Sequence, residues 1–177
     1  MPGATDFNVG ANVKAPRKLL MTFVDVNSLE TSETYDWELV GRGVEDSSID
    51  LNANTEKVTD ITGITDTEVT KWEPEQEFDP NTVRGGSKLN FKLHDIWYKK
   101  KPELLSQFNV LIVYAYIDGA SDGTFVAEVQ KGCTVNITSI GGSSHVDMPI
   151  SISYSNNSTQ GTVTIANGVP TFTAATA

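Results

Sequence analysis

Four residues in one short segment are of the types that carry out nucleophilic catalysis. Ser143, Ser144, His145 and Asp147 together supply hydroxyls, an imidazole and a carboxylate. A catalytic triad holds these groups in a fixed chain of hydrogen bonds, and known triads assemble them from distant segments of a rigid scaffold. These residues instead follow a Gly-Gly pair, which is a turn signal. We therefore expect a surface loop here and no triad.

Other residues that bind metals or activate substrates are scarce. His94 is the only histidine besides His145, and Cys133 is the single cysteine. A Cys-based zinc site and an internal disulfide are therefore excluded. Neither the phosphate-binding glycine loop with its lysine nor a GxGxxG sequence after a strand is present. We expect no enzyme activity, no metal and no cofactor, and a buried or half-buried thiol at Cys133.

Carboxylates are the most abundant charged groups, and they are unevenly placed. The chain has a net charge of −10, and residues 30–79 hold fifteen acids against three bases. This balance argues against binding of phosphate backbones as the main activity. Glu73, Glu75 and Glu77 alternate in an expected strand at 69–78, so the period of two places them on one face of a sheet. Pro74 indicates that this strand lies at an edge or at a bulge.

The elements that must position these acids are mostly strands. Apolar or alternating runs of strand length, separated by Gly, Asp and Asn turn signals, occupy 17–26, 35–44, 48–51, 69–78, 88–93, 109–117, 124–131, 133–140, 146–154 and 161–165. Residues 55–72, rich in Thr and Val around Gly63, predict a long, flexible β-hairpin. One helix is expected at about 95–107 with Asp95 as its N-cap. The pattern predicts an all-β chain with one helix, as a β-sandwich or flattened barrel of two packed antiparallel sheets flanked by the helix.

The two ends of the chain have the composition of extended arms. Residues 1–16 mix Gly, Ala, Asn and Pro, and residues 169–177 are small and Thr-rich, so neither end predicts a central strand. The alternatives are frayed termini or arms that become ordered on a neighbouring subunit. The second reading gives five apolar residues as arm contacts: Phe7, Val9, Val13, Val169 and Phe172. The domain between the arms is then 17–168.

No segment has the features of a membrane span or of a secretion signal. No apolar run approaches the roughly 18 residues that a membrane helix needs. Residues 1–16 lack a charged segment followed by an apolar one. We expect no membrane association, and a protein that is made and kept, or assembled, in a cytoplasm.

The order of segments along the chain carries a family resemblance. These segments are WELVGRG at 37–43, IDLNAN at 49–54, the Thr-rich loop around Gly63, VTKWEP at 69–74, KLNFKL at 88–93, the lysine-flanked helix, an apolar strand at 110–117, and a strand at 123–129 before a Ser/Ile-rich run. Over roughly residues 17–168 this order resembles the major tail tube proteins of long-tailed, siphovirus-like phages, within the superfamily that includes the type VI secretion tube.

The resemblance implies a fold, an assembly and partners. Such proteins form hexameric rings that stack into a hollow tube, and the sheets of six subunits join into one β-barrel around the lumen. It implies that residues 53–67 form an inter-ring loop, with Thr55, Val58, Ile61, Gly63 and Ile64 as contacts. The implied partners are further copies of the chain, a tape-measure protein and tail-end proteins, in a virion tail assembled in the host cytoplasm.

A physical role for the acids follows from that assembly. DNA must slide through the lumen without sticking, and a carboxylate wall repels phosphates across a layer of water and counterions. The candidate lumen-facing acids are Glu45, Asp46, Asp50, Glu73, Glu75 and Glu77. The alternative is that these acids face outward and only keep the subunit soluble.

Two other classes of protein compete with the tail tube. One is a β-sandwich that binds carbohydrate or a receptor, which would need an exposed aromatic platform. Trp37, Trp72 and Trp97 are spread over separate segments, which favours core packing or subunit contacts. The other is a different virion protein, such as a capsid decoration or tail-completion protein.

Overall fold

The computed structural model describes residues 7–30, 34–119, 121 and 123–175. The described part is built from β-strands with one α-helix, which confirms the expected fold class. The elements are η1 (Arg17–Leu19), β1 (Leu20–Asp25), β2 (Trp37–Leu39), β3 (Ile49–Asp50), β4 (Ala53–Thr59), β5 (Thr65–Trp72), β6 (Glu75–Phe78), α1 (Lys88–Lys99), η2 (Pro102–Ser106), β7 (Phe108–Asp118), β8 (Phe125–Ile137), β9 (Ile150–Ser153), β10 (Ser158–Ala166) and β11 (Val169–Ala174). None of the described helices is long and apolar enough to cross a membrane.

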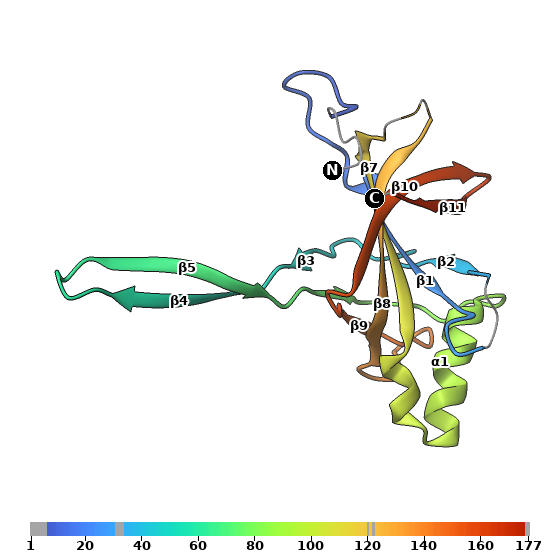
Figure 1. Cartoon of the computed structure of the whole chain (residues 1–177). Helices are drawn as coiled ribbons and strands as arrows, with labels where there is room; N and C mark the ends of the chain where they lie inside the picture. Colours follow the sequence, from blue (N-terminus) through green and yellow to red (C-terminus); the bar gives the residue numbers. More distant parts are fainter. Residues whose placement is uncertain (1–6, 31–33, 120, 122, 176–177) are drawn as a thin grey trace.

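Nine strands form one curled antiparallel sheet that forks at β8 (Figure 1). One side of β8 pairs with β7, followed by β1 and β2. On its other side, 125–130 pair with β10, and 134–137 pair with β9, followed by β6 and β3. Gly132, with φ of 71°, lies between the two pairings. The sequence predicted two strands, at 124–131 and 133–140, where the protein has one strand that serves both branches.

The core lies on both faces of β7. Phe108, Val110 and Ile112 face a cluster that includes the buried side of α1, while Leu111 and Val113 face a second cluster against β8 and β10. A strand covered on both faces reads as a continuous apolar run, because no position is left for a polar side chain. This packing explains why the longest apolar stretch of the sequence is β7.

Helix α1 begins seven residues before the predicted helix start. Ser87 caps it by accepting a hydrogen bond from the Asn90 amide at 3.1 Å. Leu89, Leu93 and Ile96 follow at helical spacing and are buried in the core. The strand predicted at 88–93 was therefore wrong, because the alternation of apolar residues in KLNFKL also fits part of a helical stripe.

The end of the predicted helix was also wrong. Lys100 adopts a left-handed conformation, with φ of 55°, and ends α1. Pro102 lacks an amide proton for continuing an α-helix, and it starts the separate 3-10 helix η2 instead. Asp95, the expected N-cap, lies inside α1 and forms an ion pair with Lys99 at 2.7 Å.

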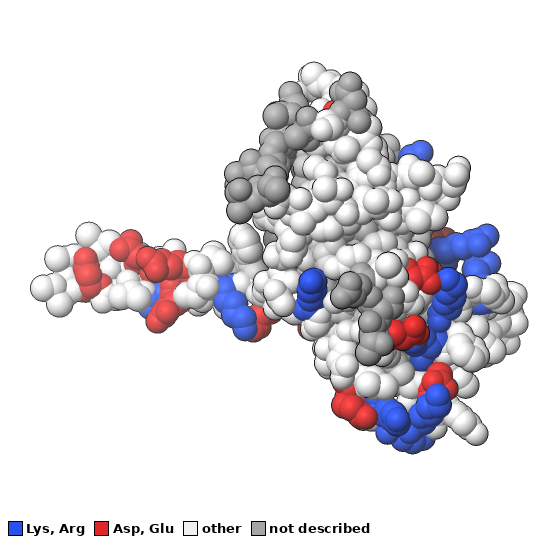
Figure 2. Space-filling view, turned by 45° about the vertical axis from the view of Figure 1, so that its right-hand side comes forward, with Lys and Arg blue, Asp and Glu red and all other residues white. Residues whose placement is uncertain are grey.

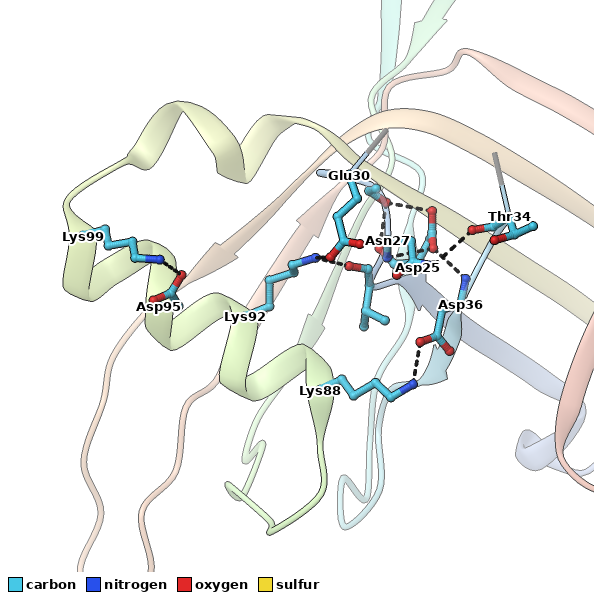
Figure 3. A network of polar contacts seen from close by, with 11 residues as sticks. Asp25, Asn27, Glu30, Thr34, Asp36, Lys88, Lys92, Asp95 and Lys99 are labelled. Carbon is cyan, nitrogen blue, oxygen red and sulfur yellow. Dashed lines mark hydrogen bonds and ion pairs between the residues drawn. The ribbon is translucent and has the colours of Figure 1, made fainter. Parts of the chain in front are cut away.

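Polar contacts fix α1 against the loop that follows β1 (Figure 3). Lys92 donates to the Val26 carbonyl and pairs with Glu30 at 3.0 Å, and Lys88 pairs with Asp36 at 2.5 Å. The buried Asp25 carboxylate accepts hydrogen bonds from both backbone and side chains; its donors are Asn27 N, Asp36 N, Ser28 Oγ and Asn109 Nδ2. These hydrogen bonds satisfy the buried carboxylate and hold the loop in one arrangement.

The C-terminal segment differs from the predicted arm. Val169–Ala174 forms β11, which pairs with β10 through a turn at Asn167 and Gly168. Both turn residues have positive φ, at 52° and 80°, as the tight hairpin turn Asn-Gly requires. Residues 169–174 are thus part of the subunit's own sheet. Residues 176–177 and the first six residues of the predicted N-terminal arm lie outside the described part.

Candidate functional site: surfaces available for assembly

The hairpin β4–β5 projects from the body as a two-stranded sheet of its own (Figure 1). Every residue of both strands is exposed. A lone two-stranded hairpin is marginally stable in water, because it lacks a third strand or a helix to pack on. The sequence correctly predicted this hairpin, which includes the 53–67 stretch.

Local hydrogen bonds close the tip of the hairpin. The Asp60 carboxylate accepts from the Thr62 hydroxyl at 2.6 Å, the Thr62 amide at 2.7 Å and the Ile64 amide at 3.0 Å. These bonds favour the charged form and lower the pKa of Asp60, the Thr62 hydroxyl being the largest cause. Gly63 takes φ of 82°, which suits a glycine in the turn. The tip is therefore held by its own polar groups.

Apolar side chains of the hairpin are open to water. Ile61 is fully exposed at the tip, and three further aliphatic side chains are more than half exposed; they are Val58, Ile64 and Val69. Apolar side chains gathered on one projecting element make the hairpin a candidate interaction surface. Val58, Ile61 and Ile64 are three of the five residues expected to form inter-ring contacts.

The two faces of the hairpin differ in charge. Glu56 lies directly opposite Glu68, and Val58 lies opposite Asp66, all on one face. The other face carries Thr-rich pairs and one cation; these pairs are Thr55–Val69, Lys57–Thr67 and Thr59–Thr65. The first set, Glu56, Glu68 and Asp66 around Val58, is called the acidic hairpin face below.

The outer face of the β3–β6 branch brings three of the candidate lumen acids together. In β6, Glu75 and Glu77 are exposed, while Gln76 and Phe78 are buried. Asp50 in β3 lies directly opposite Glu75. The spacing of two thus correctly placed Glu75 and Glu77 on one face. We call Asp50, Glu75 and Glu77 the β6 acidic face.

The other candidate lumen acids lie elsewhere. Glu73 precedes Pro74 between β5 and β6, so the continuous strand expected at 69–78 is divided. Its carboxylate accepts from Lys71 at 2.5 Å, which lowers the pKa of Glu73. Glu45 and Asp46 lie in the loop between β2 and β3, where Glu45 lines a groove.

That groove, of about 930 Å³, lies between β2, the loop that follows it and the N-terminal end of α1. Lys18, Arg42 and Arg84 line it and are exposed, and none of the three forms an ion pair within the described part of the chain. Sequence analysis missed this feature. The three cations come from segments separated by other elements, so no local pattern links them.

The candidate arm contacts occupy two positions on the body. Phe7 bridges to Ile117 at the end of β7 and stacks on Tyr116, with ring centroids 6.3 Å apart. Val13 and Val169 are each 61% exposed. Phe172 in β11 packs partly against the second core cluster. Contacts of these residues with a neighbouring subunit remain a prediction, as does that of the partly buried Val9.

The residues of catalytic type do not assemble into a triad. Ser144 Oγ lies 3.3 Å from His145 Nδ1, but the Asp147 carboxylate accepts from the Thr82 hydroxyl at 2.7 Å. Cys133 is buried, and burial raises the pKa of its thiol. In the described part of the chain, no three His, Cys, Asp or Glu side chains converge as a metal site would require.

Two tryptophans are half exposed on separate elements. Trp72 ends the hairpin strand β5, and Trp97 lies on α1, where Lys100 covers its ring with Nζ 3.3 Å from the centroid. Trp37 packs partly against the second core cluster. The three rings therefore do not form one flat platform of the kind that binds sugars.

Comparison with known proteins shows a shared fold. No family model matches the sequence, and no curated protein matches it. Among solved structures, the chain is similar to the sheath/tube terminator of an extracellular contractile injection system, PVC, in its extended state. The TM-score is 0.52 at 10% identity, over 85% of this chain and 99% of that one.

Two further solved structures lie below that level of similarity. One comes from the PVC sheath–tube complex, with a TM-score of 0.49 and 10% identity over 93% of this chain and 95% of that one. The other is the tube-terminating cap of the anti-feeding prophage, with a TM-score of 0.46 and 12% identity over 86% and 94%. Only the first of these TM-scores exceeds 0.5, and its sequence identity is low. The comparison therefore shows that the chain shares its fold with the sheath/tube terminator.

Proposed function

We propose that this chain is a structural subunit that assembles into rings, and that the rings stack into a hollow tail tube through which DNA passes. The observation that carries the proposal is the hairpin β4–β5, which projects without a single buried residue and with apolar side chains in water. Such an element gains its stability from a surface on another subunit. The fold shared with a contractile-system terminator supports the same role.

The β6 acidic face is the proposed lumen wall. Asp50, Glu75 and Glu77 are exposed, and serines from β9 flank them, with Ser153 donating to Glu75 at 3.2 Å. A hydrated face of this kind repels phosphate and offers no cations for it to bind. A ring of six subunits, a tape-measure protein inside and end proteins at the tube's tips complete the proposed assembly in the virion tail.

The first test is assembly of the purified full chain, imaged by negative-stain electron microscopy. Tubes or stacked rings are expected. In an Ile61→Asp/Ile64→Asp variant, tubes should disappear while the urea unfolding curve stays unchanged, because both side chains lie in the exposed tip. Val146→Asp, at a body position that is 55% exposed, is the matched control and should still assemble. A wild-type chain that stays monomeric at high concentration would contradict the proposal.

The lumen assignment needs its own test. In phage whose tubes carry Asp50→Lys, Glu75→Lys and Glu77→Lys, tubes should form, but DNA ejection should be impaired because lysines bind the passing phosphates. Normal ejection through such tubes would place the β6 acidic face outside the lumen.

A second candidate, a terminator that caps a tube, is favoured by the likeness to the PVC terminator. In that role the chain would stop growth at the end of a tube built by another protein. Micrographs separate the two roles: a tube subunit produces long tubes by itself, whereas a terminator does not.

A further inference from the structure

The acidic hairpin face is electrostatically unfavourable in the isolated subunit. Glu56 and Glu68 are direct cross-strand partners, and Asp66 lies on the same face. Side chains at such positions have their Cβ atoms only about 5 Å apart, and like charges there destabilise the pair. Lys57 projects from the opposite face, and Lys71 is engaged by Glu73. The hairpin thus holds carboxylates together without a cation of its own between them.

The groove beside β2 presents the opposite arrangement. Lys18, Arg42 and Arg84 form its cationic rim, while Met21 and Trp37 are partly buried in its apolar lining. Other charged groups at this groove are already engaged. The Arg17 guanidinium donates to the Ser47 carbonyl at 2.6 Å, and Lys88 pairs with Asp36.

Glu38, also in the groove lining, is engaged as well. Its carboxylate accepts from the Ser87 hydroxyl and from the amides of Lys88 and Leu89 at the start of α1. Helix amides favour a carboxylate at this position. Of the carboxylates in the lining, Glu45 alone forms no hydrogen bond or ion pair within the described part of the chain. The three rim cations therefore outnumber Glu45, the one carboxylate of the described lining that is not already engaged.

We infer that the groove rimmed by Lys18, Arg42 and Arg84 receives the acidic hairpin face of a second copy of this chain. The apolar residues match as well as the charges, since Val58 lies among the hairpin acids and Trp37 lies in the groove. The proposed tube function requires contacts between copies, so this inference rests on that function and assigns the surface that receives the hairpin.

The placement of the two surfaces sets the kind of assembly. In Figure 1 the hairpin extends to the left, whereas β2 and α1, which border the groove, lie on the right. In Figure 2 acidic side chains lie along the hairpin, and cationic side chains gather on the body. Two different patches on opposite sides give a head-to-tail contact, which propagates into closed rings or open filaments rather than a two-fold dimer.

The experiment is a charge reversal with rescue in the full-length protein. Arg42→Glu/Arg84→Glu should slow tube growth at least about tenfold at low salt, measured by light scattering and counted in micrographs. Glu56→Lys/Glu68→Lys should slow it similarly. An equimolar mixture of the two variants should recover growth in part, because the lysine-bearing hairpin of one fits the glutamate-bearing groove of the other and the unchanged hairpin fits the unchanged groove, so that only alternating contacts are complementary. The quadruple variant, which restores opposite charges at every contact, should regain most of the growth rate.

The matched control is Lys101→Glu/Lys131→Glu, which changes the net charge equally at exposed positions outside the groove. It should assemble at the wild-type rate. Unfolding curves of all variants should match that of the wild type, since the altered side chains are exposed. Tubes that grow normally from Arg42→Glu/Arg84→Glu, or a quadruple variant without recovery, would overturn the inference while leaving the tube function intact. Absence of tubes from the wild type would instead refute the proposed function.

Discussion

Two antiparallel strand pairs in this protein have opposite environments. In β7–β8, most side chains of β7 are buried, because α1 covers one face and β10 flanks the other. In β4–β5, no side chain is buried on either face. Both pairs contain β-branched residues, which favour extended backbone. The comparison teaches that local preference makes a strand, whereas neighbouring elements make it stable.

The same substitution in each pair gives the largest expected contrast. Ile112→Ala in β7 removes a side chain that is 1% exposed and should lower the free energy of unfolding by about 2–5 kcal/mol. Ile64→Ala at the hairpin, where the side chain is 62% exposed, should change it by less than about 0.5 kcal/mol. Urea denaturation of the unassembled subunit measures both. Equal losses would mean that the hairpin packs on its own subunit.

Alkaline pH should act on the body and spare the hairpin. Burial raises the pKa of Tyr154 above its ordinary value of 10.0. The unfolded chain therefore loses that proton first, so the stabilisation is complete below about pH 10 and is lost as pH rises toward the folded-state pKa. Above pH 10 the wild type should lose about 1.4 kcal/mol per pH unit more than Tyr154→Phe.

The comparison for this pH effect is Tyr98→Phe, at a tyrosine that is 76% exposed on α1. This variant shows how much of any change in slope follows from replacing a tyrosine by phenylalanine elsewhere in the chain. Tyr154→Phe lowers stability at neutral pH too, through loss of the 2.6 Å bond to Gln76, so the test compares slopes between pH 10 and 11 rather than absolute values. Parallel slopes for wild type and Tyr154→Phe would exclude this tyrosine as the source.

Loss of the helix cap tests how much Ser87 contributes to the stability of α1. Ser87→Ala removes the acceptor for the Asn90 amide and the donor to Glu38. Stability should fall by about 1 kcal/mol. Ser48→Ala, at an exposed serine near β3, is the control and should have little effect on the urea midpoint. An unchanged midpoint in Ser87→Ala would show that tertiary packing alone sets the start of α1.

The smallest expected effect is confined to the hairpin tip. Asp60→Asn weakens acceptance from the Thr62 and Ile64 amides, so hydrogen exchange at Ile64 should accelerate while global unfolding is unchanged. Because the pKa of Asp60 is lowered on folding, its contribution is present above the ordinary value of 3.8 and is lost as pH falls through the folded-state pKa. The wild-type tip should therefore resemble the variant in acid. A global loss of stability would contradict the independence of the hairpin.

Local chemistry accounts for the elements that were predicted correctly. The hairpin follows from β-branched residues around Gly63, and the alternation of Glu75 and Glu77 follows from the period of two. The helix was placed too late, because Leu89, Phe91 and Leu93 fit a strand as well as the first turns of a helix. Only burial separates the two readings, since Leu89 and Leu93 lie in the core and Phe91 is 75% exposed.

By itself, the sequence determined the all-β class with one helix, the projecting hairpin and the concentration of acids in the first half of the chain, because these depend on backbone preference and composition. The tertiary structure alone decided that β8 serves two branches, that 169–174 complete a sheet, and that Lys18, Arg42 and Arg84 share a groove. These features depend on which distant segments pack together. A periodic pattern records that one face of a segment is buried, but it does not record which distant segment covers that face.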